Sequence, residues 1–521
     1  MAERPEVSRG HSTAKGNVPC RGSTNGAGRA EQWESHEREE CKTVQREQKT
    51  GKSGCPAGDR VEPKEPQGAQ NAGIREAENG DSANGREPER SLLEAILSLN
   101  NVWEAQERVI ANRGSAGIDG MAVEELNEYL IKQYPELCES IRGGWYKPKP
   151  VKRVEIPKAD GGKRLLGVPT VIDRMVQQAM VQVLQPIFEQ TFSDSSFGFR
   201  PKRNAHQAMQ RAKKYYEEGY KYVVDLDLEK YFDTVNHDLL IKMVRETVKD
   251  EAVIGLIRKF LKSGVMVDGL VSQTEQGTPQ GGNLSPLLSN IYLTKFDKML
   301  EERGHKFVRY ADDCNIYVKS PRAAERVMAG CIKFLEGKLK LKVNRKKSTT
   351  GSPTKLKFLG FSLYEWKGKI GIRVHEKPLK RLKERLKAMT SRKRGGTIEQ
   401  ILTEIIRLMN GWLGYYRLAD MKKYLQRISE WLRRRMRQLY WKRWKRVRTR
   451  YENLIKLGVP HDNAWQWANT RKGYWCIAGS MIMTTTMDNR YFETLGFPNI
   501  LERYAELRER AKLLEILHGT C

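Results

Sequence analysis

The chain changes character sharply at Ser91, and this change limits where a folded core can form. Residues 1–90 contain no Leu, Phe or Tyr and are rich in Gly, Glu, Arg and Ser. A segment of this composition buries too little apolar surface to offset the entropy lost on ordering. We therefore interpret it as a disordered polar tail. Ser91 is a good N-cap for the helix that follows, whose Leu and Ile side chains share one face.

The ordered part must fold with a large excess of positive charge. The 93 Lys and Arg residues exceed the 64 Asp and Glu residues, which gives a formal net charge of +29. Such a surplus attracts polyanions, and nucleic acid is the usual partner, although a solvated surface or an acidic membrane is an alternative. No apolar run approaches the ~20 residues of a membrane span, and no signal-peptide pattern is present. The scattered cysteines and histidines predict reduced thiols in a cytoplasm and no structural zinc.

A strand with acids on one face is predicted at residues 222–228, Tyr-Val-Val-Asp-Leu-Asp-Leu. Alternation places apolar side chains on one face and Asp225 and Asp227 on the other. Two carboxylates near the end of a strand are costly unless a divalent metal or a Lys or Arg partner neutralises them. Taken alone, this strand is more typical of a structural or capping feature.

A second acidic element is predicted at residues 307–318, where two strands flank a tight turn at Ala311-Asp312-Asp313. Adjacent acids are common in turns, but this pair lies about 85 residues after Asp227, so both elements can meet at one sheet edge. Two Mg²⁺ ions about 4 Å apart could then activate a 3′-hydroxyl and stabilise a leaving pyrophosphate. We assign Asp227 and Asp312 as bridging ligands, Asp313 as a supporting ligand, and Asp225 as a residue that orients them.

A basic β-hairpin is expected over residues 146–169, turning at Asp160-Gly161-Gly162. Seven basic side chains crowd it against two acids. Lysines also protect solvated edge strands, which is the alternative interpretation. In the functional interpretation, Lys158 and Arg164 hold a nucleoside triphosphate, and the guanidinium can bind two phosphate oxygens.

Residues 276–286 form a predicted loop-to-helix junction. Ser285 and Pro286 suit the N-cap and first helical positions. Two adjacent glycines let backbone approach a ligand closely, and Gln280 can both donate and accept hydrogen bonds.

Residues 431–450 hold ten Arg and Lys residues and no acid. Apolar residues spaced by three or four from Leu432 to Leu454 predict one continuous helix. A solvated helix usually includes Glu for pairing at i,i+4, so the absence of acids favours a phosphate track over membrane docking. The assigned nucleic-acid contacts are Arg433, Arg434, Arg437, Lys442 and Arg443.

Together these motifs resemble the bacterial group II intron reverse transcriptases of the compact type. Tyr310-Ala311-Asp312-Asp313 matches the Y-x-D-D box of reverse transcriptases, and residues 227–237 resemble the family's first-aspartate motif. Residues 276–286 match its P-Q-G-x-x-x-S-P motif, and the basic segment resembles its thumb or maturase domain. The resemblance runs from about residue 92 to at least 475, with the motifs in the family's order.

The resemblance implies roles for further residues. Phe232, five residues after Asp227, would pack under the incoming sugar where a 2′-hydroxyl would clash, and so select dNTPs; an ordinary core phenylalanine is the alternative. Gln280 would lie beside the nucleotide and the template base. Nucleic-acid contacts are implied for three basic residues in matching segments, Arg113, Arg200 and Lys347.

The resemblance also implies an α+β right-hand polymerase fold, with fingers and palm followed by a mostly α-helical thumb or maturase domain. The C-terminal part has no Cys/His cluster suited to an H-N-H endonuclease. The expected ranges are 1–90 for the tail, 91–145 for a helical N-terminal extension of the fingers, 146–365 for fingers and palm, 376–475 for the thumb or maturase domain, and 476–521 for a C-terminal extension without endonuclease.

The implied activity is RNA-directed DNA synthesis with two Mg²⁺ ions, dNTPs, an RNA template and a DNA primer. The chain would bind the structured intron RNA, assist its splicing and mobility, and meet target DNA. The alternatives are a reverse transcriptase recruited by the host, for instance in phage defence, a splicing cofactor with a relic polymerase site, and an RNA-templated RNA polymerase. The intact acids and Gln280 argue against the relic, and Phe232 argues against RNA synthesis.

Overall fold

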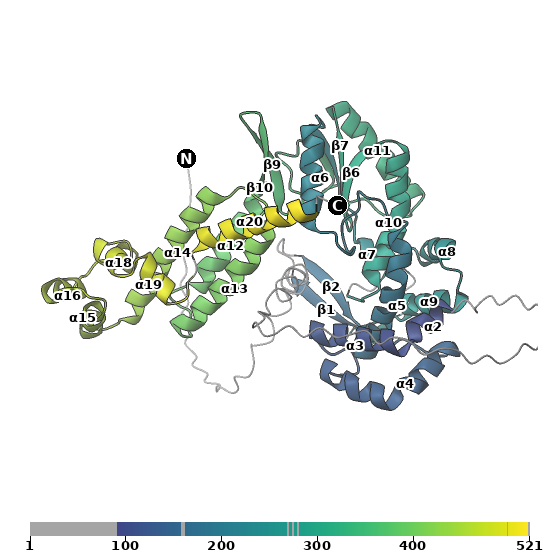
Figure 1. Ribbon diagram of the computed structural model, residues 1–521, viewed down its shortest axis with the longest axis horizontal. Helices are drawn as coiled ribbons and strands as arrows, with labels where there is room; N and C mark the ends of the chain where they lie inside the picture. The colour runs from purple at the N-terminus through teal and green to yellow at the C-terminus, as the bar shows by residue number, and fades with distance from the viewer. Residues whose placement is uncertain are drawn as a thin grey trace, which may run out of the picture. The chain divides into compact units, whose positions relative to one another are not determined.

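The computed structural model describes residues 91–157, 162–267, 270–272, 276–278, 281–497 and 499–518. The expected tail lies outside these described residues, as do two predicted nucleotide-binding residues, Lys158 and Gln280. Within the described ranges strands and helices alternate as far as β10, and only helices follow it (Figure 1). No helix in these ranges combines the length and apolar character needed to cross a membrane.

A four-stranded antiparallel sheet forms the centre of the region predicted as the palm, in the order β6-β7-β3-β8. The bounds are β3 (Tyr222–Leu226), β6 (Lys306–Tyr310), β7 (Asp313–Val318) and β8 (Thr349–Gly351). The strand predicted at 222–228 is confirmed as β3, which pairs with β7 from Tyr222 opposite Val318 to Leu226 opposite Cys314. This register places the end of β3 beside the start of β7.

The hairpin predicted at 307–318 is also confirmed. Tyr310 pairs with Asp313, so Ala311 and Asp312 form a two-residue turn between β6 and β7. Ala311 has a φ of 57°, in the left-handed region that tight hairpin turns favour. The turn also packs closely on Gly198, where an added Cβ would lie 2.3 Å from the Ala311 nitrogen.

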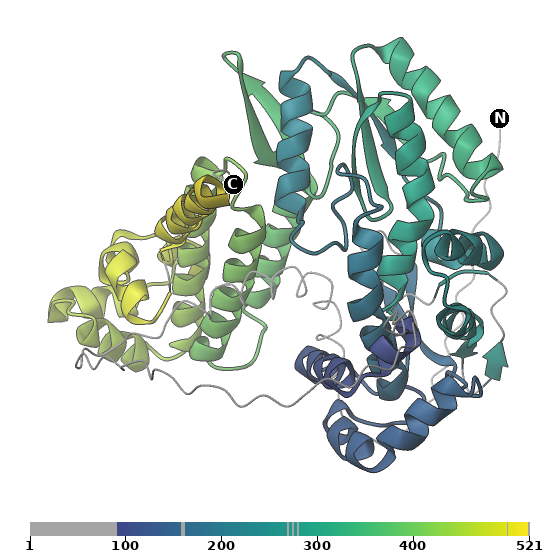
Figure 2. The ribbon, with the colours of Figure 1, turned by 45° about the vertical axis from the view of Figure 1, so that its right-hand side comes forward.

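Helices cover both faces of the palm sheet. Helix α6 packs on β6, whereas α11 packs on β3, β7 and β8, and Figures 1 and 2 show these two helices on opposite sides of the strands. Val223 accordingly joins the apolar cluster of α6, and Val224 joins that of α10 and α11. The helices of this region are α5 (Val171–Glu189), α6 (Ala205–Glu217), α7 (Tyr231–Thr234), α8 (His237–Thr247), α9 (Glu251–Lys262), α10 (Ser285–Glu302) and α11 (Pro321–Gly337).

The strand pairing of the predicted basic hairpin is confirmed as β1 and β2, within a sheet of order β2-β1-β4-β5, whereas Asp160 and Gly161 of its predicted turn lie outside the described residues. Asp173, at the start of α5, holds the chain that leads into it, because its carboxylate accepts hydrogen bonds from Tyr146 Oη at 2.7 Å and Lys149 N at 3.1 Å. The elements here are α2 (Leu92–Leu97), α3 (Leu99–Asn112), η2 (Val123–Glu125), α4 (Leu126–Arg142), β1 (Val151–Pro157), β2 (Lys163–Val168), β4 (Val265–Val267) and β5 (Leu270–Ser272).

One predicted helix start is confirmed in position and the other is corrected, since Ser91 occupies the N-cap of α2 but Ser285 does not occupy that of α10. The Ser91 side chain does not cap α2, because Asp250 accepts hydrogen bonds from Ser91 Oγ at 2.7 Å and Leu93 N at 3.1 Å. A carboxylate from a distant segment therefore satisfies this helix N-terminus. Ser285 is the first helical residue of α10, and Leu284 occupies the N-cap position.

The hairpin of β9 (Phe361–Trp366) and β10 (Lys369–Val374) leads into a helical region, as expected for a thumb. Gly395 and Gly396 lie between α12 and α13, where the helical path is interrupted. The C-terminal helices share the core of α14, because Met487 and Phe492 belong to its apolar cluster. The helices are α12 (Glu376–Met389), α13 (Ile398–Tyr416), α14 (Lys422–Arg443), α15 (Val447–Lys456), α16 (His461–Ala468), α17 (Tyr474–Ile477), α18 (Met481–Thr486), α19 (Asn489–Thr494) and α20 (Ile500–His518).

The prediction of one continuous helix through residues 431–450 is wrong. Helix α14 ends at Arg443, and α15 begins at Val447. Trp444 packs its ring 5.8 Å from that of Trp441, and Arg450 Nε donates to the Trp444 carbonyl oxygen at 2.9 Å. These contacts stabilise a turn that the spacing of apolar residues does not reveal.

The palm and the thumb helices meet at a half-buried histidine. His206 Nε2, on α6, lies 2.6 Å from the carbonyl oxygen of Tyr415 on α13, and its ring contacts Phe361 of β9. Burial, together with the nearby charge of Arg417, lowers the pKa of His206 to about 4. The ring is therefore neutral at pH 7 and donates its Nε2 proton to the carbonyl.

We expect this histidine to make the protein less stable in acid. The unfolded chain takes up the proton near pH 6.5 and the folded chain only near pH 4, so the free energy of unfolding falls as the pH drops between these values. The loss should be of order 2 kcal/mol. His206→Gln keeps a donor without titrating, and its stability should depend less on pH. Equal pH profiles of chemical denaturation for both proteins would contradict this assignment.

Candidate active site

The predicted acids gather where β3 ends beside the β6–β7 turn. Asp227 directly follows β3, and Asp312 and Asp313 lie in the turn and at the start of β7. Because Leu226 pairs with Cys314, the register brings both elements to the same edge of the sheet. Asp225 directly precedes Leu226 in β3 and pairs with Asn315 of β7.

Asp227 is held by a segment that follows α11. Asn344 Nδ2 donates to Asp227 Oδ2 at 3.0 Å, and Ser348 Oγ accepts from Asp227 N at 3.1 Å. The Asn344 backbone nitrogen donates to the Asp227 carbonyl oxygen at 2.8 Å. Lys347 Nζ lies 3.9 Å from Asp227 Oδ2, so this predicted nucleic-acid contact stands beside the acids. Together these bonds fix the Asp227 backbone and carboxylate.

The acids repel one another strongly. Burial and the charge of Asp227 raise the pKa of Asp225 to about 6, although Lys357 opposes the shift. Asp313 is exposed at the surface, yet the surrounding protein reduces its hydration, and this loss followed by the charges of Asp312, Asp225 and Asp227 raises its pKa to about 7. Burial also raises the pKa of Asp312, and a guanidinium on β2, Arg164, lowers it. The site carries more negative charge than its neighbours neutralise.

This surplus fits a bound cation, although the acids do not form a ready-made cage. Within the described residues, no three His, Cys, Asp or Glu side chains lie close enough together to hold a metal by themselves. Hard cations such as Mg²⁺ commonly use one or two carboxylates and complete their shell with water and phosphate oxygens. The donor set of carboxylates alone is of the type that Mg²⁺ prefers.

A fully buried ion pair supports the turn from behind. Arg309 of β6 donates to both carboxylate oxygens of Asp297 on α10, at 2.7 and 2.6 Å. Its third nitrogen donates to the carbonyl oxygen of Ala311 at 2.8 Å and to Asn290 Oδ1 at 3.1 Å. Burial opposes the charge on Arg309, but Asp297 raises its pKa, so the guanidinium stays charged. Burial also raises the pKa of Asp297, yet contact with a guanidinium, which does not deprotonate in proteins, keeps the pair ionised.

The residues predicted to bind the nucleotide are only partly described. Arg164 is exposed on β2 and acts electrostatically on Asp312, as noted above. Phe232 is half-buried, and its carbonyl oxygen accepts a 2.6 Å hydrogen bond from Thr278 N. This bond joins the first-aspartate motif to the loop that precedes α10. Lys158 and Gln280 lie outside the described residues.

Two predicted nucleic-acid contacts are corrected because their guanidinium groups are buried. Arg200 is 7% exposed, and its Nε donates to Glu189 Oε1 at 2.9 Å. Arg437 is 8% exposed, and its Nε donates to the carbonyl oxygen of Met487 at 2.9 Å. Both side chains therefore stabilise the protein in this conformation.

Other predicted contacts on α14 also bind the protein itself, but they remain partly accessible. Arg434 stacks 4.2 Å from the ring centre of Trp475 and donates to its carbonyl oxygen. Arg433 donates to Ser429 Oγ at 2.7 Å, and Arg443 donates to the carbonyl oxygen of Gly396 at 2.7 Å. The remaining predicted contacts are Lys442, which lies 5.4 Å from the ring centre of Tyr474, and Arg113, which is exposed at the end of α3.

Several supporting residues were not predicted from the sequence. Asn344 and Ser348 lie in a segment whose lysines and arginine indicate a nucleic-acid contact. No regular spacing distinguishes these two residues from other polar residues. Asn290 and Asp297 did carry a signal, because they are polar residues seven apart on the otherwise buried face of α10. A buried acid on such a helix calls for a cationic partner.

Comparison with known proteins gives a concordant result. Residues 156–363 match the family described as "Reverse transcriptase (RNA-dependent DNA polymerase)", and residues 379–458 match "Group II intron, maturase-specific domain". Protein YkfC of Escherichia coli K12 is 35% identical over 297 residues, which are 49% of this chain and 78% of YkfC. The group II intron-encoded protein LtrA of Lactococcus lactis is 35% identical over 219 residues, 42% of this chain but only 36% of LtrA. Among solved structures, a telomerase from Candida tropicalis aligns with 65% of this chain and 68% of its own, at 14% identity and a TM-score of 0.36.

The palm sheet with its acidic corner, followed by basic helices, defines a right-hand polymerase. The chain belongs to the reverse transcriptases that carry a group II intron maturase domain, and its class is RNA-directed DNA polymerase.

We expect Asp297→Asn to impair catalysis through the turn that carries Asp312. The substitution leaves the buried Arg309 without a counter-charge, which should lower the free energy of unfolding by about 3 kcal/mol. Because the turn loosens, kcat for primer extension should fall while KM for dNTP changes little. Lys295→Met on the same helix is the control, since it breaks an exposed ion pair with Glu246 of α8 and should cost less than about 1 kcal/mol. A less stable Asp297→Asn protein with unchanged kcat would show that the ion pair serves stability alone.

Proposed function

We propose that this protein extends a DNA primer on an RNA template by two-metal nucleotidyl transfer, using Asp227, Asp312 and Asp313 as ligands of two Mg²⁺ ions. The observation that carries the proposal is the register of β3 and β7, which brings acids from two separate segments to one sheet edge. Magnesium ions bound there would increase the acidity of the primer 3′-hydroxyl and stabilise the leaving pyrophosphate.

The chain's own groups would position the reactants. Asn344 and Ser348 hold Asp227, and Arg309 holds the turn carbonyl beside Asp312. Arg164, whose charge reaches Asp312, is placed to bind the triphosphate. Preorganised charges of this kind account for most of the catalytic effect in phosphoryl transfer.

We also propose that the protein works while bound to structured RNA. The maturase-specific match over residues 379–458 and the intron-encoded relative support an intron RNA as this partner, with splicing and mobility into target DNA as the outcome. Such a role would place it in the bacterial cytoplasm, at the nucleoid. A splicing cofactor with a relic polymerase site is the less favoured function, because the supported cluster of acids would then have no use. A reverse transcriptase recruited by its host would share the same chemistry on a different RNA.

Replacing a metal ligand tests the polymerase directly. Asp312→Asn keeps the shape of the side chain but removes its charge, so primer extension with dNTPs and Mg²⁺ should fall by about 10³-fold or more. RNA affinity should change little, because Asp312 would contact the template only through the ions. Asp194→Asn, at an exposed acid far along the chain from the cluster, should retain full activity. If Asp312→Asn still extends the primer, the assignment is refuted. If the variant loses RNA binding as well as activity, the assignment is refuted too, because the turn would then have a structural role.

The sugar gate is tested by the choice between dNTPs and rNTPs. Phe232→Ala should reduce the ratio of kcat/KM for dNTP over rNTP by about 10- to 100-fold, because the smaller side chain no longer excludes a 2′-hydroxyl. Phe334→Ala is the matched control, since Phe334 is likewise half-buried against the same apolar cluster. If both variants keep the wild-type ratio, Phe232 is an ordinary core residue.

A further inference from the structure

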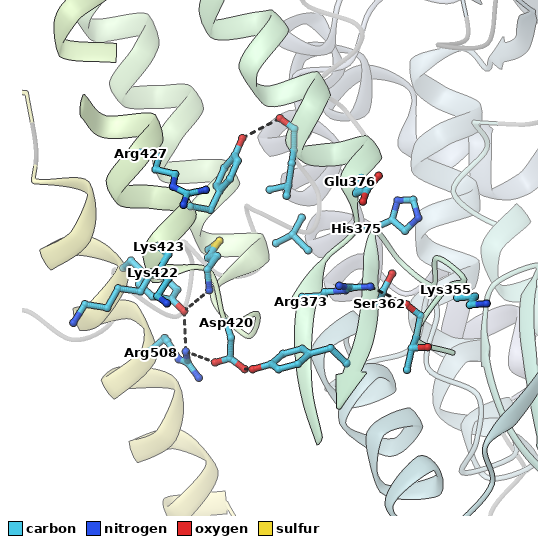
Figure 3. A pocket seen from close by; sticks show the side chains of 17 residues that line it. Lys355, Ser362, Arg373, His375, Glu376, Asp420, Lys422, Lys423, Arg427 and Arg508 are labelled. Atoms are coloured by element: carbon cyan, nitrogen blue, oxygen red, sulfur yellow. Dashed lines mark hydrogen bonds and ion pairs between the residues drawn. The ribbon is translucent and has the colours of Figure 1, made fainter. Parts of the chain in front are cut away.

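A cavity lies in the region where the β9–β10 hairpin leads into the thumb helices. Its volume is about 860 Å³, and its walls come from β9, β10, the first turns of α12 and α14, and α20 (Figure 3). None of the four clustered acids lines it. We call it the junction pocket. Its lining is not used by the chemistry described above, so it needs another explanation.

The junction pocket is strongly positive. Six Lys and Arg residues line it together with two acids, and this gives a net charge of +4. The histidine of the lining, His375, adds no charge at pH 7 because burial and nearby lysines lower its pKa. The six cations are Lys355, Arg373, Lys422, Lys423, Arg427 and Arg508.

The acids of the junction pocket do not neutralise most of these cations. Asp420 accepts hydrogen bonds from Tyr364 Oη and Arg508 Nη1, both at 2.8 Å, so its charge is already matched (Figure 3). Four other cations have exposed side chains whose charged groups make no hydrogen bond or ion pair to a described residue: Lys355, Lys422, Lys423 and Arg427. Like charges that share a concave surface repel one another, and a ligand of opposite sign relieves this repulsion.

The start of α14 adds to the same positive field. This helix has 22 residues, no side-chain cap and no acid in its first turn. The first turn holds Lys422 and Lys423 instead, which lie at the positive end of the helix dipole. This arrangement disfavours the isolated helix and favours an anion at the mouth of the pocket.

We propose that the junction pocket binds successive phosphodiester groups of the structured RNA partner, at a contact separate from the primer–template site. This inference rests on the proposed RNA-bound function. The pocket is open, and its cations come from β10, α14, α20 and the loop before β9, which suits a phosphate backbone that passes through it better than one small anion. The match to the maturase-specific domain begins at Leu379 and includes Lys422 and Arg427, so part of the wall belongs to the region expected to hold the RNA.

The test compares the salt dependence of RNA binding for two triple variants of the full chain. Lys422→Ala, Lys423→Ala and Arg427→Ala together remove three unpaired cations from the junction pocket. A folded, dye-labelled RNA hairpin with a single-stranded loop is the probe, and fluorescence anisotropy at several KCl concentrations gives the affinity. The slope of log affinity against log salt should fall by about two, and affinity at moderate salt should fall about tenfold or more.

The control removes the same charge elsewhere. Arg322→Ala, Arg326→Ala and Lys333→Ala together neutralise three exposed cations of α11, and this variant should keep the wild-type slope. An equal loss in both variants would show that net charge alone governs binding, which overturns the proposal. Unchanged affinity and slope in the pocket variant would overturn it as well.

Two further measurements distinguish RNA binding in the junction pocket from the polymerase function and from binding of a small anion. Primer extension on a short RNA template with a DNA primer reports the polymerase, so an active enzyme with an unchanged slope refutes the pocket and leaves the proposed function intact. Competition with inorganic phosphate and with a dNTP tests a small-anion site. If millimolar phosphate protects the pocket lysines from acetylation while the RNA hairpin does not, the occupant is a small anion and the RNA proposal fails.

Discussion

Repulsion among carboxylates at one sheet edge is the constraint around which the palm is built. Burial and the charges of neighbouring carboxylates raise the pKa of Asp225, Asp312 and Asp313, so keeping these acids together costs folding energy in the protein by itself. The surrounding structure must therefore hold these carboxylates in place with specific hydrogen bonds and ion pairs. Asn344 and Ser348 bind Asp227, and the buried pair of Arg309 and Asp297 binds the turn. Asn344 and Ser348 lie more than 100 residues after Asp227, and Asp297 comes from α10, whereas Arg309 belongs to the hairpin that it supports.

Arginine serves two different purposes in this chain. Arg200, Arg309 and Arg437 are buried, and they donate to acids or carbonyl oxygens that would otherwise be unsatisfied. The cations of the junction pocket, by contrast, are exposed and mostly unpaired within the described residues. A basic sequence therefore does not by itself identify a nucleic-acid surface. The distinction depends on which guanidinium groups have already found partners.

In the thumb, too, some basic side chains stabilise the fold instead of facing a ligand. Its α14 holds apolar residues such as Leu432 and Met436 in a shared core with the C-terminal helices. Several of its arginines bind carbonyl oxygens of neighbouring segments, which connects α14 to the chain before and after it. The maturase-specific match covers α14 and α15 but not the C-terminal helices that complete their core. The folded unit is thus larger than the matched region.

Local pattern in the sequence determined the elements that bear the chemistry. Alternation identified β3, two strand-like runs around Ala311-Asp312 identified the hairpin, and the Y-x-D-D box identified the family, because strand periodicity and turn residues are properties of short segments. The tertiary structure alone decided which polar groups were buried and therefore satisfied. It placed Asn344 beside Asp227, withdrew Arg200 and Arg437 from the surface, ended α14 at Arg443 and assembled the junction pocket. Burial depends on which distant segments pack together, and no short stretch of sequence contains that information.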